Sequence, residues 1–218
     1  FSHVAANAVF QRSPPVKFHA SLARSNIGAI SNWPGATSLS RVLAGPWCTQ
    51  TLADLGADVV KVERPQVGDD TRGWGPPFLQ TPLHTDSAES AYFLGANRNK
   101  RSITCDLSSA QGQQLVRDLA VQADVFVENY KVGDMQRYGL DYASLKTLNP
   151  KLVYCSVTGF GQTGPLASMQ AYAHLINAIS GIMDLDRSGE PTPRASYLQT
   201  ADVLAGAHAF GAISAALY

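Results

Sequence analysis

Apolar residues gather in short runs that alternate with stretches of helical periodicity from about Ser40 onward. Runs of this length that are rich in β-branched residues are typical of buried strands. The pattern predicts strands at residues 57–63, 102–107, 124–128 and 152–158, and helices at residues 47–55, 109–122, 141–149 and 165–180, with a last helix opened by Thr200. Mostly apolar strands that alternate with helices predict an α/β fold, with a mostly parallel sheet covered by helices on both faces.

Two stretches depart from this pattern. Residues 66–86 are rich in Pro, Gly and Asp and predict a loop. Residues 1–39 contain no Asp or Glu, and their Arg, Ser and Ala content is typical of a transit peptide. Within them, Pro34 and Gly35 argue against a central strand at residues 33–38. We therefore expect an irregular or targeting-like segment at 1–39 and a folded part at 40–218.

Charge and cysteine usage narrow the class further. Lys and Arg total 17, as do Asp and Glu, so the net charge of zero points to neither a nucleic acid nor a membrane surface as partner. No apolar run is expected to reach membrane-spanning length, which predicts a soluble protein. The three cysteines are widely spaced in apolar runs, so buried free thiols are expected, with neither disulfides nor a metal site: Cys48, Cys105 and Cys155. A reducing, cytoplasmic location fits best, and the acid-free N-terminus leaves a mitochondrial location as the alternative.

The stretch GFGQTG, residues 159–164, has the spacing of a dinucleotide-binding turn and follows a predicted strand. Asp184 lies about twenty residues further on, but no strand leads to it, as a ribose-binding acid would require. Pro165 also removes an N–H where amides should converge on a pyrophosphate. We therefore expect a glycine-rich turn at the carboxyl end of a parallel strand, where α/β proteins bind ligands, and no NAD.

Basic and amide side chains follow several predicted strands or precede them. Arg64 comes directly after one strand, and residues 97–101 form a basic turn before the next. Together with Asn129, Lys131 and Arg137, these residues could offer several donors to a polyphosphate ligand. Each of them alone is equally compatible with a solvated surface.

Three long blocks of sequence resemble the family III CoA-transferases, also called the CaiB/BaiF family. They read SRVLAGPWCTQTLADLGADVVKVERPQVGDDTRGWGPPF, YFLGANRNKRSITCDL and ADVFVENYKVGDMQRYGLDYASLKTLNPKLVYCSVTGFGQTGP, and the likeness extends from about Ser40 to Tyr218. The resemblance implies a Rossmann-like large domain of which this chain is the N-terminal part, a second smaller domain, and an interlinked homodimer. It also implies an enzyme that moves coenzyme A between an acyl-CoA and a small carboxylic acid.

The resemblance assigns the site residues. The family's nucleophilic aspartate falls on Asp202, within QTADVLAG. A carboxylate in the first turn of a helix that Thr200 caps would be kept ionised by the helix dipole, and small residues after it would leave room for a thioester. The resemblance places the CoA-binding positions at Val42, Leu43, Arg64, Asn129, Tyr130 and Arg137. The implied mechanism uses a covalent aspartyl intermediate and neither metal nor redox cofactor.

Three alternatives stay open. The family also contains 2-methylacyl-CoA racemases, whose G-H-D-like block falls on Ala171-Tyr172-Ala173, where the histidine is missing and His174 would lie on another helix face. A non-catalytic CoA-binding fragment is the second. An NAD-dependent oxidoreductase, resting on GFGQTG alone, is the third.

Overall fold

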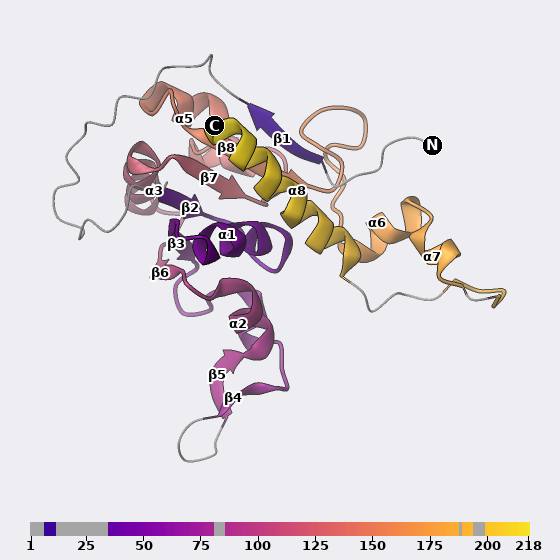
Figure 1. Ribbon diagram of the computed structural model, residues 1–218. Coiled ribbons are helices and arrows are strands. Elements are labelled where there is room, and N and C mark those ends of the chain that lie inside the picture. Colours follow the sequence, from indigo (N-terminus) through magenta and orange to yellow (C-terminus); the bar gives the residue numbers. More distant parts are fainter. Residues whose placement is uncertain (1–6, 12–34, 81–85, 188, 194–198) are drawn as a thin grey trace.

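The main feature of the structure is a six-stranded sheet with the strand order β1-β8-β7-β2-β3-β6 (Figure 1). The computed structural model describes residues 7–11, 35–80, 86–187, 189–193 and 199–218. Every pairing in this sheet is parallel except that of β1 with β8. The strands are β1 (Asn7–Gln11), β2 (Gly35–Ser38), β3 (Asp58–Glu63), β6 (Arg101–Thr104), β7 (Val125–Glu128) and β8 (Val153–Thr158). The predicted mostly parallel α/β fold is confirmed.

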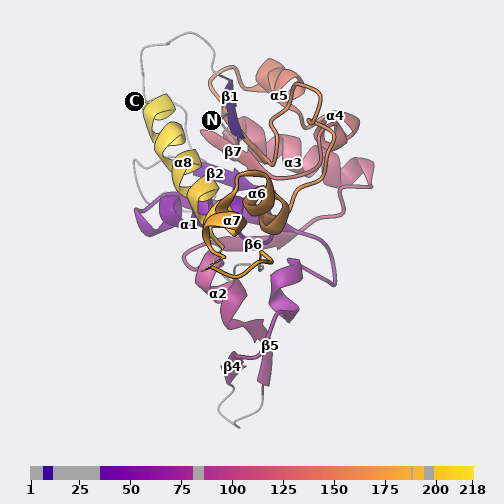
Figure 2. The same ribbon diagram turned by 90° about the vertical axis from the view of Figure 1, so that its right-hand side faces the viewer.

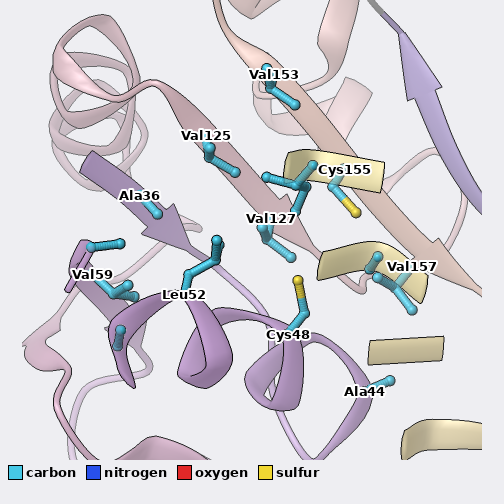
Figure 3. Close-up of a cluster of buried hydrophobic side chains, with 14 of the residues drawn as sticks. Ala36, Ala44, Cys48, Leu52, Val59, Val125, Val127, Val153, Cys155 and Val157 are labelled. Atoms are coloured by element: carbon cyan, nitrogen blue, oxygen red, sulfur yellow. The ribbon is translucent and has the colours of Figure 1, made fainter. Parts of the chain in front are cut away.

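One face of the sheet is covered by α1 (Ala44–Asp54) and α8 (Thr200–Leu217). Figure 3 shows the core between the sheet and these helices, where valines of the central strands pack against Leu52 and Cys48 of α1. Ala205, Ala209 and Ile213 of α8 belong to the same buried cluster. Alternate residues of each strand therefore point to this side, as the pleat of a strand requires.

The opposite face is covered by α3 (Ala110–Gln122), α4 (Asp134–Tyr138) and α5 (Tyr142–Leu148). Phe126 lies between Val125 and Val127, and Tyr154 between Val153 and Cys155 of the first face; both rings point to this side and stack on each other. Helices thus cover both faces, as the strand composition predicted. The prediction of buried free cysteines is also confirmed for all three.

The strand β2 overturns the expectation that residues 33–38 would not form a central strand. Gly35–Ser38 lies between β3 and β7 in the middle of the sheet, and Ala36, Thr37 and Ser38 are buried. Gly35 is the first residue of the strand, and its N–H donates to Asp124 Oδ2 at 2.8 Å. A glycine at the end of a strand destabilises the strand less than a glycine in its interior. The small side chains of Ala36, Thr37 and Ser38 are buried at this central position.

The stretch predicted as a loop, residues 66–86, contains regular structure. It holds the 3₁₀ turn η1 (Asp70–Gly73) and β4 (Phe78–Gln80), which pairs with β5 (Asp86–Ser90). Figures 1 and 2 show this hairpin projecting from the sheet together with α2 (Ala91–Asn97). Proline and glycine marked the turns here correctly, but the segments between the turns were too short to be recognised.

The helix expected at 165–180 is wrong in its first half. Residues 165–169 form turns and bends, and the helix α6 covers only Ala173–Ile179. It is followed by the short helix α7 (Ile182–Leu185), which begins after Gly181 in the left-handed region. Leu166 and Met169 in this stretch are exposed, so no buried apolar face stabilises a helix there.

The last helix, α8, is 18 residues long with a mean hydropathy of 1.3, so the expectation that no apolar run would reach spanning length is wrong. By length and composition alone it could cross a membrane, which is weak evidence because a helix of a protein core passes the same test. Its buried side chains pack against α1 and the sheet.

Candidate functional site

The carboxyl ends of the parallel strands meet at one edge of the sheet, which lies on the side of α6 and α7 in Figure 1. From β2 the chain builds β3 and β6 on one side and β7 and β8 on the other, so β2 is the switch point where α/β proteins bind ligands. Two segments meet there. Arg41 N–H donates to Asn129 Oδ1 at 2.9 Å, and Asn129 Nδ2 donates to the Arg41 carbonyl at 2.7 Å.

A basic cluster stands beside this switch point. Arg41 and Arg64 both bind the carboxylate of Asp70, one on each oxygen. Their side chains are about half exposed, and a shallow pocket beside them is lined by Lys61, Asp69 and Tyr130 among others. Two guanidinium groups held side by side at the end of a sheet form an arrangement suited to an anion.

Four of the predicted CoA-binding residues converge on this edge: Val42, Arg64, Asn129 and Tyr130. Leu43 is also there, as the residue before α1, but its side chain is buried. Arg137 is separate. It lies on α4, exposed, paired with Asp134 and placed over the ring of Tyr138.

Several residues at this edge escaped the sequence analysis. Asp69 is buried and pairs with buried Lys61 at 2.7 Å, although a lysine inside a β-branched strand was a visible signal. The paired charge keeps the pKa of Asp69 low despite its burial. Asp70 belongs to the same GDDTRG stretch, in which the Gly-Asp run marked only a turn.

Asp202 lies in the first turn of α8, half-buried, as predicted. Thr200 does not cap the helix, because the chain enters it through Gln199 without a side-chain capping bond. Burial raises the pKa of Asp202, and the charge of His174 lowers it in part. Tyr92 of α2 is within electrostatic reach of Asp202. Burial and the charge of Asp202 raise the pKa of Tyr92.

The approach of α8 to α1 depends on one glycine. A Cβ built on Gly206 would lie 2.7 Å from the carbonyl oxygen of Ala44 and 2.9 Å from Cβ of Trp47. Because Asp202 lies four residues before Gly206, both face α1. The close contact therefore sets Asp202 near the first turn of α1, which follows the switch-point strand.

The glycine-rich run after β8 is a turn, as expected. A Cβ on Gly159 would collide with Ala171, and Gly161 and Gly164 have positive φ. The segment does not open a helix directly, so the helix N-terminus that holds a pyrophosphate in dinucleotide sites is not found at this run. Among the described residues, no group of three or more His, Cys, Asp and Glu could hold a metal ion.

The fold and this edge define an α/β protein with a basic cluster at the switch point, which is a candidate ligand site, and a half-buried aspartate on a neighbouring helix. The model of the family described as CoA-transferase family III matches residues 37–218. The chain belongs to this family, as the sequence resemblance indicated.

Individual relatives agree with this assignment. The chain is 49% identical over 179 residues to a succinate–glutarate CoA-transferase of Agrobacterium fabrum, covering 82% of this chain and 44% of that protein. It is 45% identical to a succinyl-CoA:glutarate CoA-transferase of Mus musculus, covering 82% of this chain and 39% of that protein. A crystal structure of a CAIB/BAIF family protein from Brucella suis matches with a TM-score of 0.79 and 49% identity, over 84% of this chain and 48% of that chain. The chain thus spans less than half the length of these relatives.

Proposed function

We propose that the protein moves CoA from an acyl-CoA to a carboxylic acid, with Asp202 as the covalent nucleophile. The observation that carries the proposal is the place of Asp202: a half-buried carboxylate in the first turn of a helix, packed beside the switch point of the sheet. The family membership supports the same reaction class. The names of the relatives make succinyl-CoA and glutarate the first donor and acceptor to test.

CoA would bind along the basic edge of the sheet. Arg41 and Arg64 would offer charge-assisted bonds to its phosphates, in exchange for part of their pairing with Asp70. Asn129 already binds the backbone of Arg41 and so joins the two segments that would hold the nucleotide. The homodimer implied by the resemblance, the absence of metal and NAD, and the cytoplasmic location remain part of the proposal.

The chemistry would run through four exchanges at one carboxylate. An Asp202 oxygen attacks the thioester carbonyl, the C–S bond breaks, and a mixed anhydride and CoA thiolate result. The thiolate attacks the Asp202 carbonyl and releases the donor acid, leaving an aspartyl-CoA thioester. The acceptor carboxylate attacks this thioester and gives a second anhydride and thiolate. The thiolate then attacks the acceptor carbonyl, which forms the new acyl-CoA and frees Asp202.

The raised pKa of Asp202 has two consequences for this reaction. A more basic carboxylate is a better nucleophile once ionised, and it is protonated at a higher pH than an ordinary aspartate. The acid limb of kcat/KM should therefore lie above the usual titration range of aspartate. Replacing His174 with Gln should move this limb further up, since the histidine lowers the pKa of Asp202.

The test is an isosteric substitution in the protein expressed from its complete gene. Asp202→Asn should abolish CoA transfer and leave CoA affinity nearly unchanged, because the loss falls on the chemical step. The matched control is Asp184→Asn, since Asp184 is exposed and paired only with Arg187 among its described contacts. Acyl-CoA followed by hydroxylamine should convert Asp202 to a hydroxamate that mass spectrometry detects. Normal turnover by Asp202→Asn would refute the proposal.

A second candidate is 2-methylacyl-CoA racemisation, which needs a paired acid and base. The electrostatic influence of His174 on Asp202 is the observation that favours it. Solvent deuterium incorporation into the α-position of a 2-methylacyl-CoA, lost in His174→Gln, would support it. CoA binding with neither transfer nor exchange would instead identify a non-catalytic CoA-binding protein.

A further inference from the structure

Val42 has an unusual backbone conformation. Its φ is +67°, in the left-handed region that a β-branched residue avoids. Such a conformation persists only where surrounding contacts enforce it. Val42 lies next to Leu43, the residue that precedes α1, at the switch point of the sheet, so its conformation affects how the chain enters that helix.

Side chains from three segments hold this turn by its backbone. The peptide unit between Arg41 and Val42 is held at both ends, because its carbonyl accepts from Asn129 and its N–H points between the two Asp69 carboxylate oxygens, at 3.3 Å from each. Lys61 Nζ donates to the carbonyl of Ser40 at 2.9 Å.

Asp69 is itself held from several sides. Its carboxylate accepts a hydrogen bond from Lys61 Nζ at 2.7 Å and two more from the amide and hydroxyl of Thr71. Its own N–H donates to the Glu63 carboxylate. Lys61 is 1% exposed and Asp69 is 3% exposed. A buried ion pair adds little to stability compared with apolar residues of similar size, but it fixes geometry well. Here both members of the pair bind the backbone of the turn.

Residues 41–43 also set how α1 lies against α8. The first residue of α1, Ala44, contacts Gly206 through its carbonyl, and Asp202 lies one helical turn before Gly206. A change in the path of residues 41–43 would therefore shift both the predicted CoA-binding turn and the nearest backbone to the carboxylate.

We infer that Asp69, with Lys61 as its buried counter-ion, is a positioning residue that holds the Arg41–Val42 peptide in the conformation needed to bind CoA. This inference rests on the proposed function, and it assigns to Asp69 no contact with the substrate. Asp69 affects CoA affinity through Val42, which without the bonds from Asp69 would leave the left-handed region.

The test is a double-mutant cycle between Asp69→Asn and Val42→Gly, read by calorimetric titration with CoA. In the wild-type background Asp69→Asn should weaken CoA binding by about tenfold or more, as expected from releasing a strained residue. In the Val42→Gly background the same change should cost less than about threefold, because glycine adopts positive φ without strain. Asp58→Asn is the control, since Asp58 pairs with Arg101 at the other end of β3.

Stability is measured in parallel by urea unfolding, because a purely structural role would lower it without coupling to Val42. Equal losses of CoA affinity in both backgrounds, or no loss in either, would overturn the inference. If Asp69→Asn leaves Lys61 unpaired and does not fold, the pair Lys61→Gln with Asp69→Asn takes its place in the same cycle. A folded wild-type protein that does not bind CoA would contradict the proposed function and this inference together, whereas binding without coupling would contradict the inference alone.

Discussion

Two glutamates end the strands on either side of β2, and their electrostatic environments differ sharply. Glu63 is the last residue of β3 and Glu128 the last residue of β7; they are 5% and 3% exposed. Burial raises the pKa of Glu63, but bonds from Arg72, Ser102 and the Asp69 amide outweigh it and lower the pKa to about 2. Burial raises the pKa of Glu128 to about 7, despite bonds that stabilise its charge.

One guanidinium group contributes most to the lowered pKa of Glu63. Arg72 donates to both oxygens of Glu63 at 2.8 Å, while Glu128 has only neutral partners, among them the Tyr130 amide at 2.8 Å. Two carboxylates that are both shielded from water thus have pKa values shifted in opposite directions, because Glu63 has an ionic partner and Glu128, which is enclosed more deeply, has none among the described residues. At the edge where the carboxyl ends of the strands meet, the end of β3 is part of an ionic network, and the end of β7 is part of a neutral hydrogen-bonded network.

The largest expected effect comes from removing the partner that distinguishes the two. Arg72→Met should leave Glu63 as an uncompensated buried charge and lower the free energy of unfolding by about 3–5 kcal/mol at pH 7. Urea unfolding measures it. The matched control is Arg101→Met, which breaks the exposed pair with Asp58 and should cost at most about 1 kcal/mol. Equal effects of the two substitutions would show that the ionic network is not special.

Removing the charge of Glu128 should have the opposite sign. Its folded pKa of about 7 lies above the unfolded value, so the folded state binds more protons and wild-type stability falls as pH rises from about 4.5 to 7. Glu128→Gln keeps an acceptor for the Tyr130 amide and should raise the free energy of unfolding at pH 8 by about 3 kcal/mol. Unfolding curves between pH 4 and 8 measure it. An unchanged pH profile would contradict the neutral character of the β7 side.

The smallest effect concerns a single hydrogen bond. Ser102 Oγ donates to Glu63 Oε1, and Ser102→Ala should cost about 1 kcal/mol at pH 7. Because the folded pKa of Glu63 is depressed, its contribution is present above about pH 4.5 and is lost as pH falls toward 2. The substitution should move the acid unfolding midpoint of the protein to higher pH. A midpoint that stays in place would show that Arg72 alone sets this pKa.

The sequence predicted the sheet well wherever apolar runs were long. Three of the four predicted strands match closely, whereas β6 ends at Thr104, sooner than predicted. The strand β2 was missed because Pro34 and Gly35 argued against a central strand, although the strand begins at Gly35 and is paired with a neighbour on each side. Tertiary pairing decided this strand against its local preference.

The site was predictable in part. The resemblance named Val42, Arg64, Asn129 and Tyr130 as CoA-binding residues, a role that stays a prediction. The structure shows that they lie at one edge, because the carboxyl ends of parallel strands meet there. The positive φ of Val42 could not be predicted, because it depends on contacts from distant segments rather than on residue type. The roles of Lys61 and Asp69 depend in the same way on which segments the fold brings together.

Gly206 has a consequence for how the protein can vary. The carbonyl of Ala44 and the side chain of Trp47 leave no room there for a Cβ, so the close approach of α1 and α8 depends on the missing side chain of Gly206. Any substitution at this position acts as a wedge between the helices, whereas the exposed neighbours Ala207 and His208 can change without one. Variants designed to alter the surroundings of Asp202 should therefore leave position 206 unchanged.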